Sequence, residues 1–526
     1  MSKRSLIAVL LVTVLMLGMV GVVSAADGDK YGGTLVFGRG ADAVRLDPAD
    51  VTDGESVKVL TNVFEGLVAF KAGSTEVEPA LATAWRTSDG GKVWEFKLRE
   101  GVKFHDGSDF TADDVVFTFE RQMDENHPCH DGTFAYWGYM YSMVKNVEKI
   151  NDYHVKITLS KPYAPFIYNM ACFPAFIVSE EAMTEKGVDG FRTSPVGTGP
   201  FAFVNWEHDS QITLKAFEDY WNGRPYLDKV LFKVVPENTT RVMGLKGGDL
   251  DLVDNFGPQN VATIKEDENL KLLSQPGMNV AYMAMNQMRK PFDNKLVRKA
   301  ISWAIDKDAI IRGAYNGKAT PAKNPMPPTL WGFNHRVTDY GYDPAKATEL
   351  LVEAGYADGF SFELWYPSNP RPYMPEGKKV AQAIQSNLKD VGIEAELVTY
   401  DWGTYLDKTE EGEHDVCLMG WIGDNGDPDN FLYVLLDKDN AVPGSAGNYA
   451  FYNSYLLHQI LMEAQETTAG KQQRAGMYKA AQHVIHEDAP WVPIAYMNKF
   501  MGAANDVMGY TIHPTGQVFL KDTWVK

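Results

Sequence analysis

Cysteine and positive charge are both scarce in this chain of 526 residues. Three cysteines are too few for a disulfide-rich scaffold. The 50 lysines and arginines are outnumbered by 69 aspartates and glutamates, which gives a formal net charge of −19. A chain without surplus cations is poorly suited to replacing the counterions of nucleic-acid phosphates or to docking on anionic lipid. We therefore expect no nucleic-acid partner and no electrostatic attachment to a membrane.

The common catalytic signatures are also missing. The sequence contains no HExxH, GxSxG, GxxxxGK[ST] or CxxCH pattern. Gly38-Arg-Gly40 follows a predicted strand, but Ala43 replaces the third glycine of a dinucleotide-binding turn and Asp47-Pro48 breaks the helix that should follow. We interpret these glycines as a strand-to-loop turn. No enzymatic activity and no cofactor are expected.

Only one long apolar run is present, at residues 6–23. It follows Lys3 and Arg4 and ends in Val23-Ser24-Ala25, the small residues that a signal peptidase reads. This pattern predicts a cleaved signal peptide over residues 1–25, with a transmembrane anchor as the alternative. No cysteine lies near the cleavage point, which excludes a lipid anchor there. The mature protein is expected to be soluble and periplasmic.

The rest of the chain has an ordinary globular composition, with 45% hydrophobic and 23% charged residues. Its length exceeds what one hydrophobic core supports, so several domains are expected. Apolar periodicity and capping patterns predict strands and helices that alternate irregularly, which indicates an α/β fold with mixed sheets. The predicted strands are 33–37, 92–98, 151–159, 211–215, 229–235, 393–400 and 415–421. The predicted helices begin or lie at 112, 239–245, 296–304, 344–354, 378–388 and 472–486.

Two histidine groups are candidates for metal binding. His127-Pro-Cys129-His130 is too compact to supply a full tetrahedral set, and a solvated loop is the simpler interpretation. His483 and His486 lie three residues apart on a predicted helix, where histidines more often serve packing or the surface. We expect no metal site.

A glycine-rich loop, GDNGDPDN at residues 423–430, follows a predicted buried strand. An EF-hand is a poor match because Pro428 interrupts the acids and no glutamate closes the loop. The acids could form Asx turns, or one could meet a cationic ligand group. Upstream, Arg371 lies between two prolines. They restrict the backbone, so little conformational entropy is lost when Arg371 binds a ligand or forms a surface salt bridge. Composition does not choose between these interpretations.

Four further segments carry a resemblance to a known family. LREGVKFHDG (98–107) with FTADDVVF (110–117), PVGTGPF (195–201), LVRKA with AIDK (296–307) and YDPAKA (342–347) occur in the order seen in bacterial extracellular solute-binding proteins of the peptide/nickel/opine class. They cover nearly the whole mature chain. Within the class, the sequence most resembles periplasmic dipeptide-binding proteins, through RPY (371–373), TYDWG (399–403) and the GDNGDPDN loop.

The resemblance implies a two-lobed clamp with an extra domain inserted in the N-terminal lobe. Lobe I would comprise residues 26–70, 197–280 and 499–526, the inserted domain 71–196 and lobe II 281–498. Chain crossings near 277–281 and 499–502 would form a hinge, and ligand would be engulfed on closure.

The resemblance also assigns ligand-binding residues. Asp424 matches an acid that meets the ligand ammonium, and Arg371 matches an arginine that meets its carboxylate. Asp427 and Asp429 are expected to form the turn, because Pro428 lies between them. A loop at 52–56 matches one that contacts the peptide backbone, but Asp53 and Glu55 add charge to it. The other assigned positions are Tyr373, Trp402, Trp421, Gly423, Thr52, Gly54 and Ser56.

The leading functional hypothesis is a periplasmic, monomeric carrier that delivers dipeptides or short peptides to an inner-membrane ABC permease. A carrier of the same fold for haem, nickel chelate or longer peptides is the alternative, and a secreted peptidase is a third hypothesis, against which the missing motifs argue. Cys129 and Cys172 could pair in an oxidising periplasm, whereas Cys417 lies in a buried strand and is expected to be an inert thiol.

Overall fold

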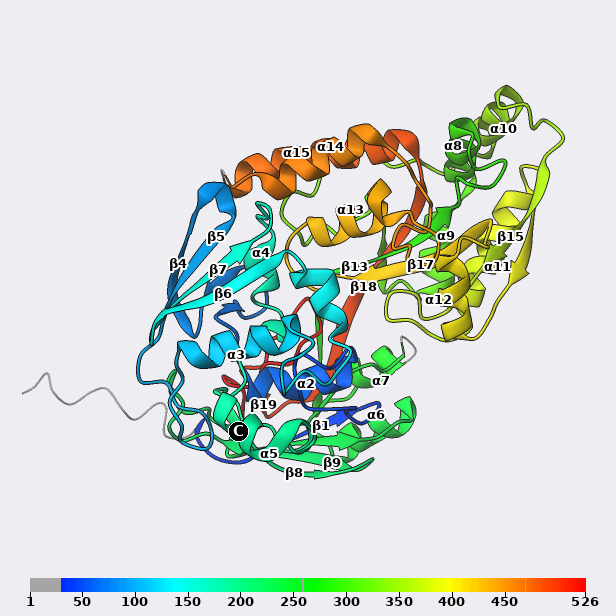
Figure 1. Cartoon of the computed structure of the whole chain (residues 1–526). Coiled ribbons are helices and arrows are strands. Elements are labelled where there is room, and N and C mark those ends of the chain that lie inside the picture. Colours follow the sequence, from blue (N-terminus) through cyan, green and yellow to red (C-terminus); the bar gives the residue numbers. More distant parts are fainter. Residues whose placement is uncertain (1–29, 258–259, 469) are drawn as a thin grey trace, which may run out of the picture.

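Two lobes are joined by extended chain in the computed structural model, which describes residues 30–257, 260–468 and 470–526 (Figure 1). Helices and strands alternate along the chain, and the predicted mixed α/β fold is confirmed. The predicted signal peptide lies outside the described residues. Within the described ranges, no helix combines the length and the apolar character needed to cross a membrane.

One twelve-stranded sheet extends through both lobes, in the order β16-β15-β17-β13-β18-β11-β1-β10-β9-β8, with β12 and β14 paired to β18 off this path. In lobe I, β1 pairs in parallel with β10 and β11. In lobe II, β13 pairs antiparallel with β17 and β18. The lobe I strands are β1 (Thr34–Arg39), β8 (Phe201–Glu207), β9 (Gln211–Ala216), β10 (Lys229–Val234), β11 (Leu252–Val253) and β12 (Leu270–Pro276). The lobe II strands are β13 (Asn279–Met285), β14 (Ala319–Pro321), β15 (Phe360–Trp365), β16 (Ile393–Val398) and β17 (Val416–Ile422), and β18 (Trp491–Ala504) belongs to both lobes.

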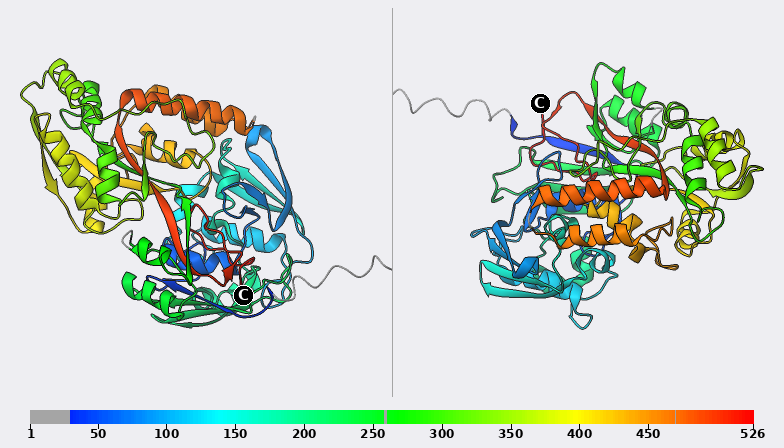
Figure 2. Two further views of the ribbon diagram at one scale, coloured as in Figure 1. Left: turned by 180° about the vertical axis from the view of Figure 1, so that it is seen from behind. Right: turned by 90° about the horizontal axis from the view of Figure 1, so that it is seen from above.

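Helices cover the sheet in both lobes. Figure 2 shows α14 and α15 lying side by side along lobe II. Lobe I carries α2 (Gly54–Val63), α6 (Asn238–Gly247) and α7 (Asn260–Lys265), with the small strands β19 (Val507–Met508) and β20 (Trp524–Val525) near the C-terminus. Lobe II carries α8 (Lys295–Ala304), α9 (Lys307–Ala314), α10 (Pro344–Glu353), α11 (Gly377–Lys389), α12 (Trp402–Glu410), α13 (Asp429–Leu436), η5 (Lys438–Asn440), α14 (Tyr455–Glu466) and α15 (Lys471–Asp488).

The segment predicted as an insertion forms its own four-stranded antiparallel sheet, β4-β5-β7-β6. Its hydrophobic core is continuous with that of lobe I: Phe96 and Ile157 belong to the same buried cluster as Leu35 and Phe37 of β1. The domain boundaries themselves stay a prediction. The elements of this part are β2 (Val68–Phe70), β3 (Val77–Pro79), β4 (Ala82–Ser88), η2 (Asp89–Gly91), β5 (Val93–Leu98), α3 (Ala112–Met123), η3 (Trp137–Tyr141), β6 (Val144–Asn151), β7 (His154–Leu159), α4 (Phe166–Asn169), η4 (Phe173–Ala175) and α5 (Glu180–Thr193).

Strand β13 is buried along its whole length and separates two cores of lobe II. Ala281 and Met283 face one core, whereas Val280 and Tyr282 face the other. Successive side chains of a strand point to opposite faces, so a central strand covered on both sides has no polar alternation. This is why the segment is a continuous apolar run in the sequence.

Local signals in the sequence predicted several element ends well. Helix α3 begins at Ala112 with a capping box between Thr111 and Asp114, and α10 begins at Pro344 after the N-cap Asp343. The strand-to-loop turn expected at Gly38-Arg-Gly40 is present at its last residue only, because β1 continues to Arg39 and the bend begins at Gly40. Gly38 serves close packing instead: a Cβ there would lie 2.6 Å from Leu250 Cδ1.

Candidate functional site

Two chain segments pass between the lobes and meet beside Asn279. The first is Gly277-Met278, between β12 and β13, and the second is β18, which pairs with β13 before Met497 and with β12 after it. The Asn279 side chain joins them, donating to the Met497 carbonyl and accepting from its N–H, both at 2.8 Å. A Cβ on Gly277 would lie 2.5 Å from the Met497 carbonyl oxygen, so this approach requires glycine. The first segment lies within the crossing predicted near 277–281, and the second passes between the lobes at Met497, just before the predicted 499–502.

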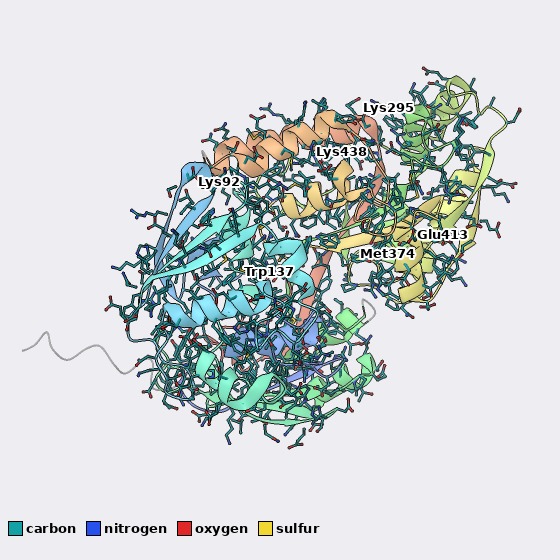
Figure 3. All side chains as sticks on the ribbon, viewed as in Figure 1. Lys92, Trp137, Lys295, Met374, Glu413 and Lys438 are labelled. Carbon is teal, nitrogen blue, oxygen red and sulfur yellow. The ribbon has the colours of Figure 1, made fainter. Side chains whose placement is uncertain are left out.

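Arg371 is held in a short backbone turn on lobe II. Its N–H donates to the Met374 carbonyl at 3.1 Å and its carbonyl accepts from the Met374 N–H at 2.9 Å. The guanidinium lies 3.9 Å from the Trp402 ring centroid, a cation–π contact. Tyr373 is buried against Gly420 of β17, where a Cβ would lie 2.2 Å from the Tyr373 ring. Arg371, Tyr373 and Trp402 are therefore brought together, as the resemblance implied. Figure 3 labels Met374, which marks this turn within lobe II.

A cavity of about 380 Å³ lies between lobe II and the inserted segment, and a second of about 340 Å³ lies at the crossing. Arg371 and Ile422 of lobe II line the crossing cavity together with Asn238 and Phe256 of lobe I. In the described part of the chain, the Arg371 guanidinium has no carboxylate within 4 Å. Its Nε is buried without a hydrogen-bond partner. The guanidinium is thus available to an anion.

Asp424 lies on the loop that runs from Ile422, which lines the crossing cavity, to Asn425, which lines the other, and is itself on neither lining. Its Oδ2 accepts from Asn430 Nδ2 at 3.1 Å and from the Tyr139 hydroxyl at 3.4 Å. Within the described residues, Oδ1 accepts no hydrogen bond from another residue. Burial raises the pKa of Asp424 to about 6, although the hydrogen bonds from Asn430 and Tyr139 oppose this.

Asn430 organises this loop and was missed in the sequence. Its Oδ1 accepts from Trp421 Nε1 and from the Asp424 N–H, each at 3.0 Å. Its Nδ2 also donates to the hydroxyl of Tyr139, on the inserted segment, at 2.8 Å. Because Tyr139 lies 291 residues away in the chain, no local pattern could reveal this contact.

Asp427 and Asp429 already have protein partners, although Asp429 also lines the 380 Å³ cavity. Asp427 is fully buried and pairs with Arg474 through two bonds of 2.6 and 2.8 Å. It also accepts from the Asp429 N–H at 3.1 Å, so Asp427 forms the expected turn. The same expectation for Asp429 is wrong: it is the first residue of α13, and its carboxylate accepts from Tyr163 and Gln465, each at 3.1 Å. Burial, helped by the Asp427 charge, raises the pKa of Asp429 to about 7.

The remaining assigned residues have different surroundings. Gly423 packs closely, since a Cβ there would lie 2.6 Å from the Phe431 ring. Asp53 is the N-cap of α2 and Gly54 its first residue, so the 52–56 segment is a helix start. Ser56 is buried and its hydroxyl accepts from the Val44 N–H at 2.9 Å, whereas Thr52 and Gly54 are exposed. The ligand contacts of these residues stay predictions.

A buried charge cluster next to α2 was not foreseen. Lys58 Nζ lies 2.7 Å from Glu55 Oε1 and 2.6 Å from Asp254 Oδ2. Burial opposes the charge of Lys58, but the two acids outweigh it and the pKa of Lys58 is raised. Glu55, suspected of adding charge to a ligand site, is thus largely committed to Lys58.

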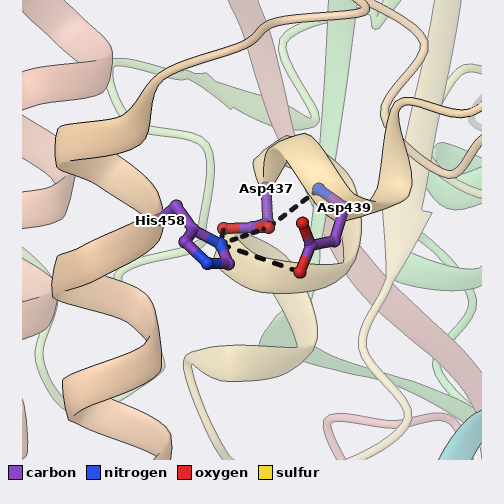
Figure 4. A group of neighbouring side chains, drawn as sticks. All are labelled: Asp437, Asp439 and His458. Carbon is purple, nitrogen blue, oxygen red and sulfur yellow. Dashed lines mark hydrogen bonds and ion pairs between the residues drawn. The ribbon is translucent and has the colours of Figure 1, made fainter.

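Within the part of the chain that the structure describes, neither histidine group of the sequence belongs to a cluster of three possible metal ligands. His127 Nδ1 accepts from the Cys129 N–H at 3.1 Å, and His130 Nδ1 donates to the Arg121 carbonyl at 2.9 Å. One group with metal-like spacing occurs among the described residues, Asp437, Asp439 and His458 (Figure 4). His458 Nδ1 lies 3.0 Å from Asp437, and Lys438 lies 2.6 Å from Asp439. These contacts engage both carboxylates.

All three cysteines are buried free thiols, so the pairing of Cys129 with Cys172 that the sequence left open is absent. Burial raises the pKa of Cys417 and of Cys172. Because the thiolate is the reactive form, we expect native Cys417 to resist iodoacetamide and to react only in denaturant. Peptide mapping after labelling checks this, and rapid modification of Cys417 in the folded protein would contradict it.

Comparison with known proteins gives a consistent result. The model of "Bacterial extracellular solute-binding proteins, family 5 Middle" matches residues 76–442. The chain is 41% identical to heme-binding protein A of Haemophilus influenzae, over 92% of this chain and 90% of that protein. It is 39% identical to the dipeptide-binding protein of Escherichia coli, over 86% and 87%. The solved periplasmic binding protein DppA from Helicobacter pylori, in complex with the peptide STSA, is 37% identical with a TM-score of 0.80, covering 95% of this chain and 100% of that one.

The family model spans well over half of the chain, and the relatives cover nearly all of it. The lobes, the crossing and the cavities at their boundary agree with a fold that encloses a solute. The chain belongs to the family 5 bacterial extracellular solute-binding proteins.

Proposed function

We propose that the protein is the periplasmic substrate-binding component of an ABC importer and that it captures dipeptides. The observation that carries the proposal is Arg371, a guanidinium without a carboxylate partner that is held on Trp402 and lines a cavity bounded by both lobes. Relatives named as dipeptide-binding proteins and a solved relative in complex with a peptide support it. The protein would act as a monomer and pass its ligand to an inner-membrane permease.

The two ends of a dipeptide suit the two charged groups. Arg371 would bind the α-carboxylate through paired N–H donors, and Asp424 Oδ1 would accept from the α-ammonium. A dipeptide holds these charges less than ~7 Å apart, because an extended residue spans at most ~3.3–3.6 Å. A longer peptide would leave one charge buried without a partner, which costs several kcal/mol. Tyr373, Trp402 and Trp421 would surround the peptide, with Gly423 allowing close approach of the loop.

The proposal requires that the protein bind a dipeptide and leave it unhydrolysed. We expect calorimetry to detect Ala-Ala binding with an affinity well above that for Ala-Ala-Ala. After prolonged incubation, mass spectrometry should recover the intact dipeptide and no free alanine. Release of alanine would favour a peptidase. Absence of dipeptide binding together with haem binding would favour the other carrier hypothesis.

Ligand should also close the clamp. Two extended crossings around Asn279 allow the lobes to rotate, and a ligand that contacts both lobes stabilises the closed arrangement. We expect small-angle scattering to give a smaller radius of gyration with saturating dipeptide than without it. An unchanged scattering curve at saturation would contradict closure.

The affinity should depend on pH through Asp424. Its pKa of about 6 without ligand means that below pH 6 the carboxylate must lose a proton before it can pair with an ammonium. The dissociation constant should therefore rise by up to about tenfold per pH unit below 6 and stay nearly constant between pH 6.5 and 7.5. Calorimetry at pH 5 and 7 checks this. Asp424→Asn should remove the dependence, and a dependence that survives this substitution would assign it to another group.

A further inference from the structure

Lys499 is a second cation on the cavity that Arg371 lines, and the peptide-terminus assignments do not use it. It lies on β18 just past the point where this strand leaves lobe II, with its backbone paired to Gln275 of β12. A Cβ on Gly516 would lie 2.3 Å from Lys499 Nζ, so the ammonium rests against the backbone of the C-terminal segment, within electrostatic range of His513. Among the described residues it has no hydrogen bond and no carboxylate within 4 Å.

The acids nearest to Lys499 already have a cation of their own. Glu55 and Asp254 attract it electrostatically but pair with Lys58 at 2.7 and 2.6 Å. Lys58 also repels Lys499, and burial is the main reason that the pKa of Lys499 is lowered. The neighbourhood therefore leaves Lys499 without a partner.

The crossing cavity thus carries two cations and, in its described lining, no acid. The other polar groups on it include the amides of Asn238, Asn255 and Asn279. Like charges facing one small cavity repel, and an anion between them relieves that repulsion as well as gaining its own hydrogen bonds. A single α-carboxylate engages Arg371 and leaves Lys499 unpaired.

Building on the proposed function, we infer that this cavity selects peptides with a second carboxylate close to the α-carboxylate, that is, dipeptides whose C-terminal residue is glutamate or aspartate. Arg371 binds the α-carboxylate and Lys499 the side-chain carboxylate. A carboxylate on the N-terminal residue lies toward Asp424 and gains nothing from Lys499.

The test compares Ala-Glu with Ala-Gln, which has nearly the same shape and no side-chain charge, and with Glu-Ala, which moves the charge to the other residue. We expect the wild-type protein to bind Ala-Glu at least tenfold more tightly than Ala-Gln, and Glu-Ala no more tightly than Ala-Gln. Lys499→Gln should abolish the preference for Ala-Glu while leaving the affinity for Ala-Gln within about threefold. Lys233→Gln removes one exposed lysine of lobe I and should leave the preference intact.

The readouts separate this inference from the proposed function. Binding of Ala-Gln to the wild-type protein tests dipeptide capture alone, and its failure would overturn the proposed function. Equal affinities of wild type for Ala-Glu and Ala-Gln, or a preference that survives Lys499→Gln, would overturn the inference while leaving dipeptide capture intact. If Lys499→Gln unfolds, Lys499→Arg keeps the charge and should retain the preference; its loss in a folded Lys499→Arg protein would also count against the inference.

Discussion

Replacing Asp424 with asparagine is expected to weaken the binding of a free dipeptide by about 2–5 kcal/mol, the range for removing one partner of a buried, hydrogen-bonded charge pair. Asparagine keeps the shape of the side chain, and Asn430 and Tyr139 remain to position it. An N-acetylated dipeptide has no ammonium, so it should bind wild type weakly and lose little more in the variant. A calorimetric cycle of two proteins against two ligands isolates the coupling energy between Asp424 and the ammonium.

The same cycle has internal controls. Arg371→Gln should show the mirror pattern, losing affinity for free dipeptides but little for C-terminal amides. Asp429→Asn changes a buried acid on the same loop and should leave dipeptide affinity nearly unchanged, because Tyr163 and Gln465 occupy that carboxylate. A coupling energy near zero at Asp424 would show that its assignment is wrong, and a large loss in Asp429→Asn would transfer the ammonium site to that residue.

The sequence revealed the parts of this protein that local chemistry determines. The capping box at Thr111 and the N-cap at Asp343 satisfy backbone groups within one helical turn, so they could be read directly. The packing role of Gly38 was missed, because the side chain that would collide with it belongs to Leu250, more than two hundred residues later in the chain. A glycine does not show whether it serves a turn or a close approach.

In the candidate site too, residues within local motifs were predicted and residues that depend on long-range contacts were not. The family motifs led to Arg371, Tyr373 and Trp402, which the structure brings together. Asn430, Tyr139 and Lys499 were missed because each depends on contacts between segments far apart in the sequence. For Asp427, the sequence predicted the turn, because its bond to the Asp429 N–H is local. It did not reveal the ion pair with Arg474, which lies 47 residues further along the chain.

That ion pair leads to the largest expected effect on stability. Asp427 and Arg474 are almost wholly buried, and Tyr478 adds a hydroxyl donor at 3.1 Å to the same carboxylate. Burial opposes the charge of Arg474, yet Asp427 outweighs it and the pKa of Arg474 is raised. Asp427→Asn removes one charge and leaves a buried guanidinium without its counterion. We expect a loss of about 3–5 kcal/mol in the free energy of unfolding, measured by urea denaturation followed through tryptophan fluorescence.

The exposed pair of Glu349 with Lys346 on α10 is the matched control. Glu349→Gln should cost at most about 1 kcal/mol, because water screens exposed charges and solvates each partner when the other is removed. The double variant Asp427→Asn/Arg474→Met should recover part of the loss, since it removes the uncompensated cation along with its partner. Equal, small losses for Asp427→Asn and Glu349→Gln would show that the loop does not depend on this ion pair. Because Asp427 anchors the loop that carries Asp424, we expect a folded Asp427→Asn protein also to bind dipeptides less tightly than the Glu349→Gln control.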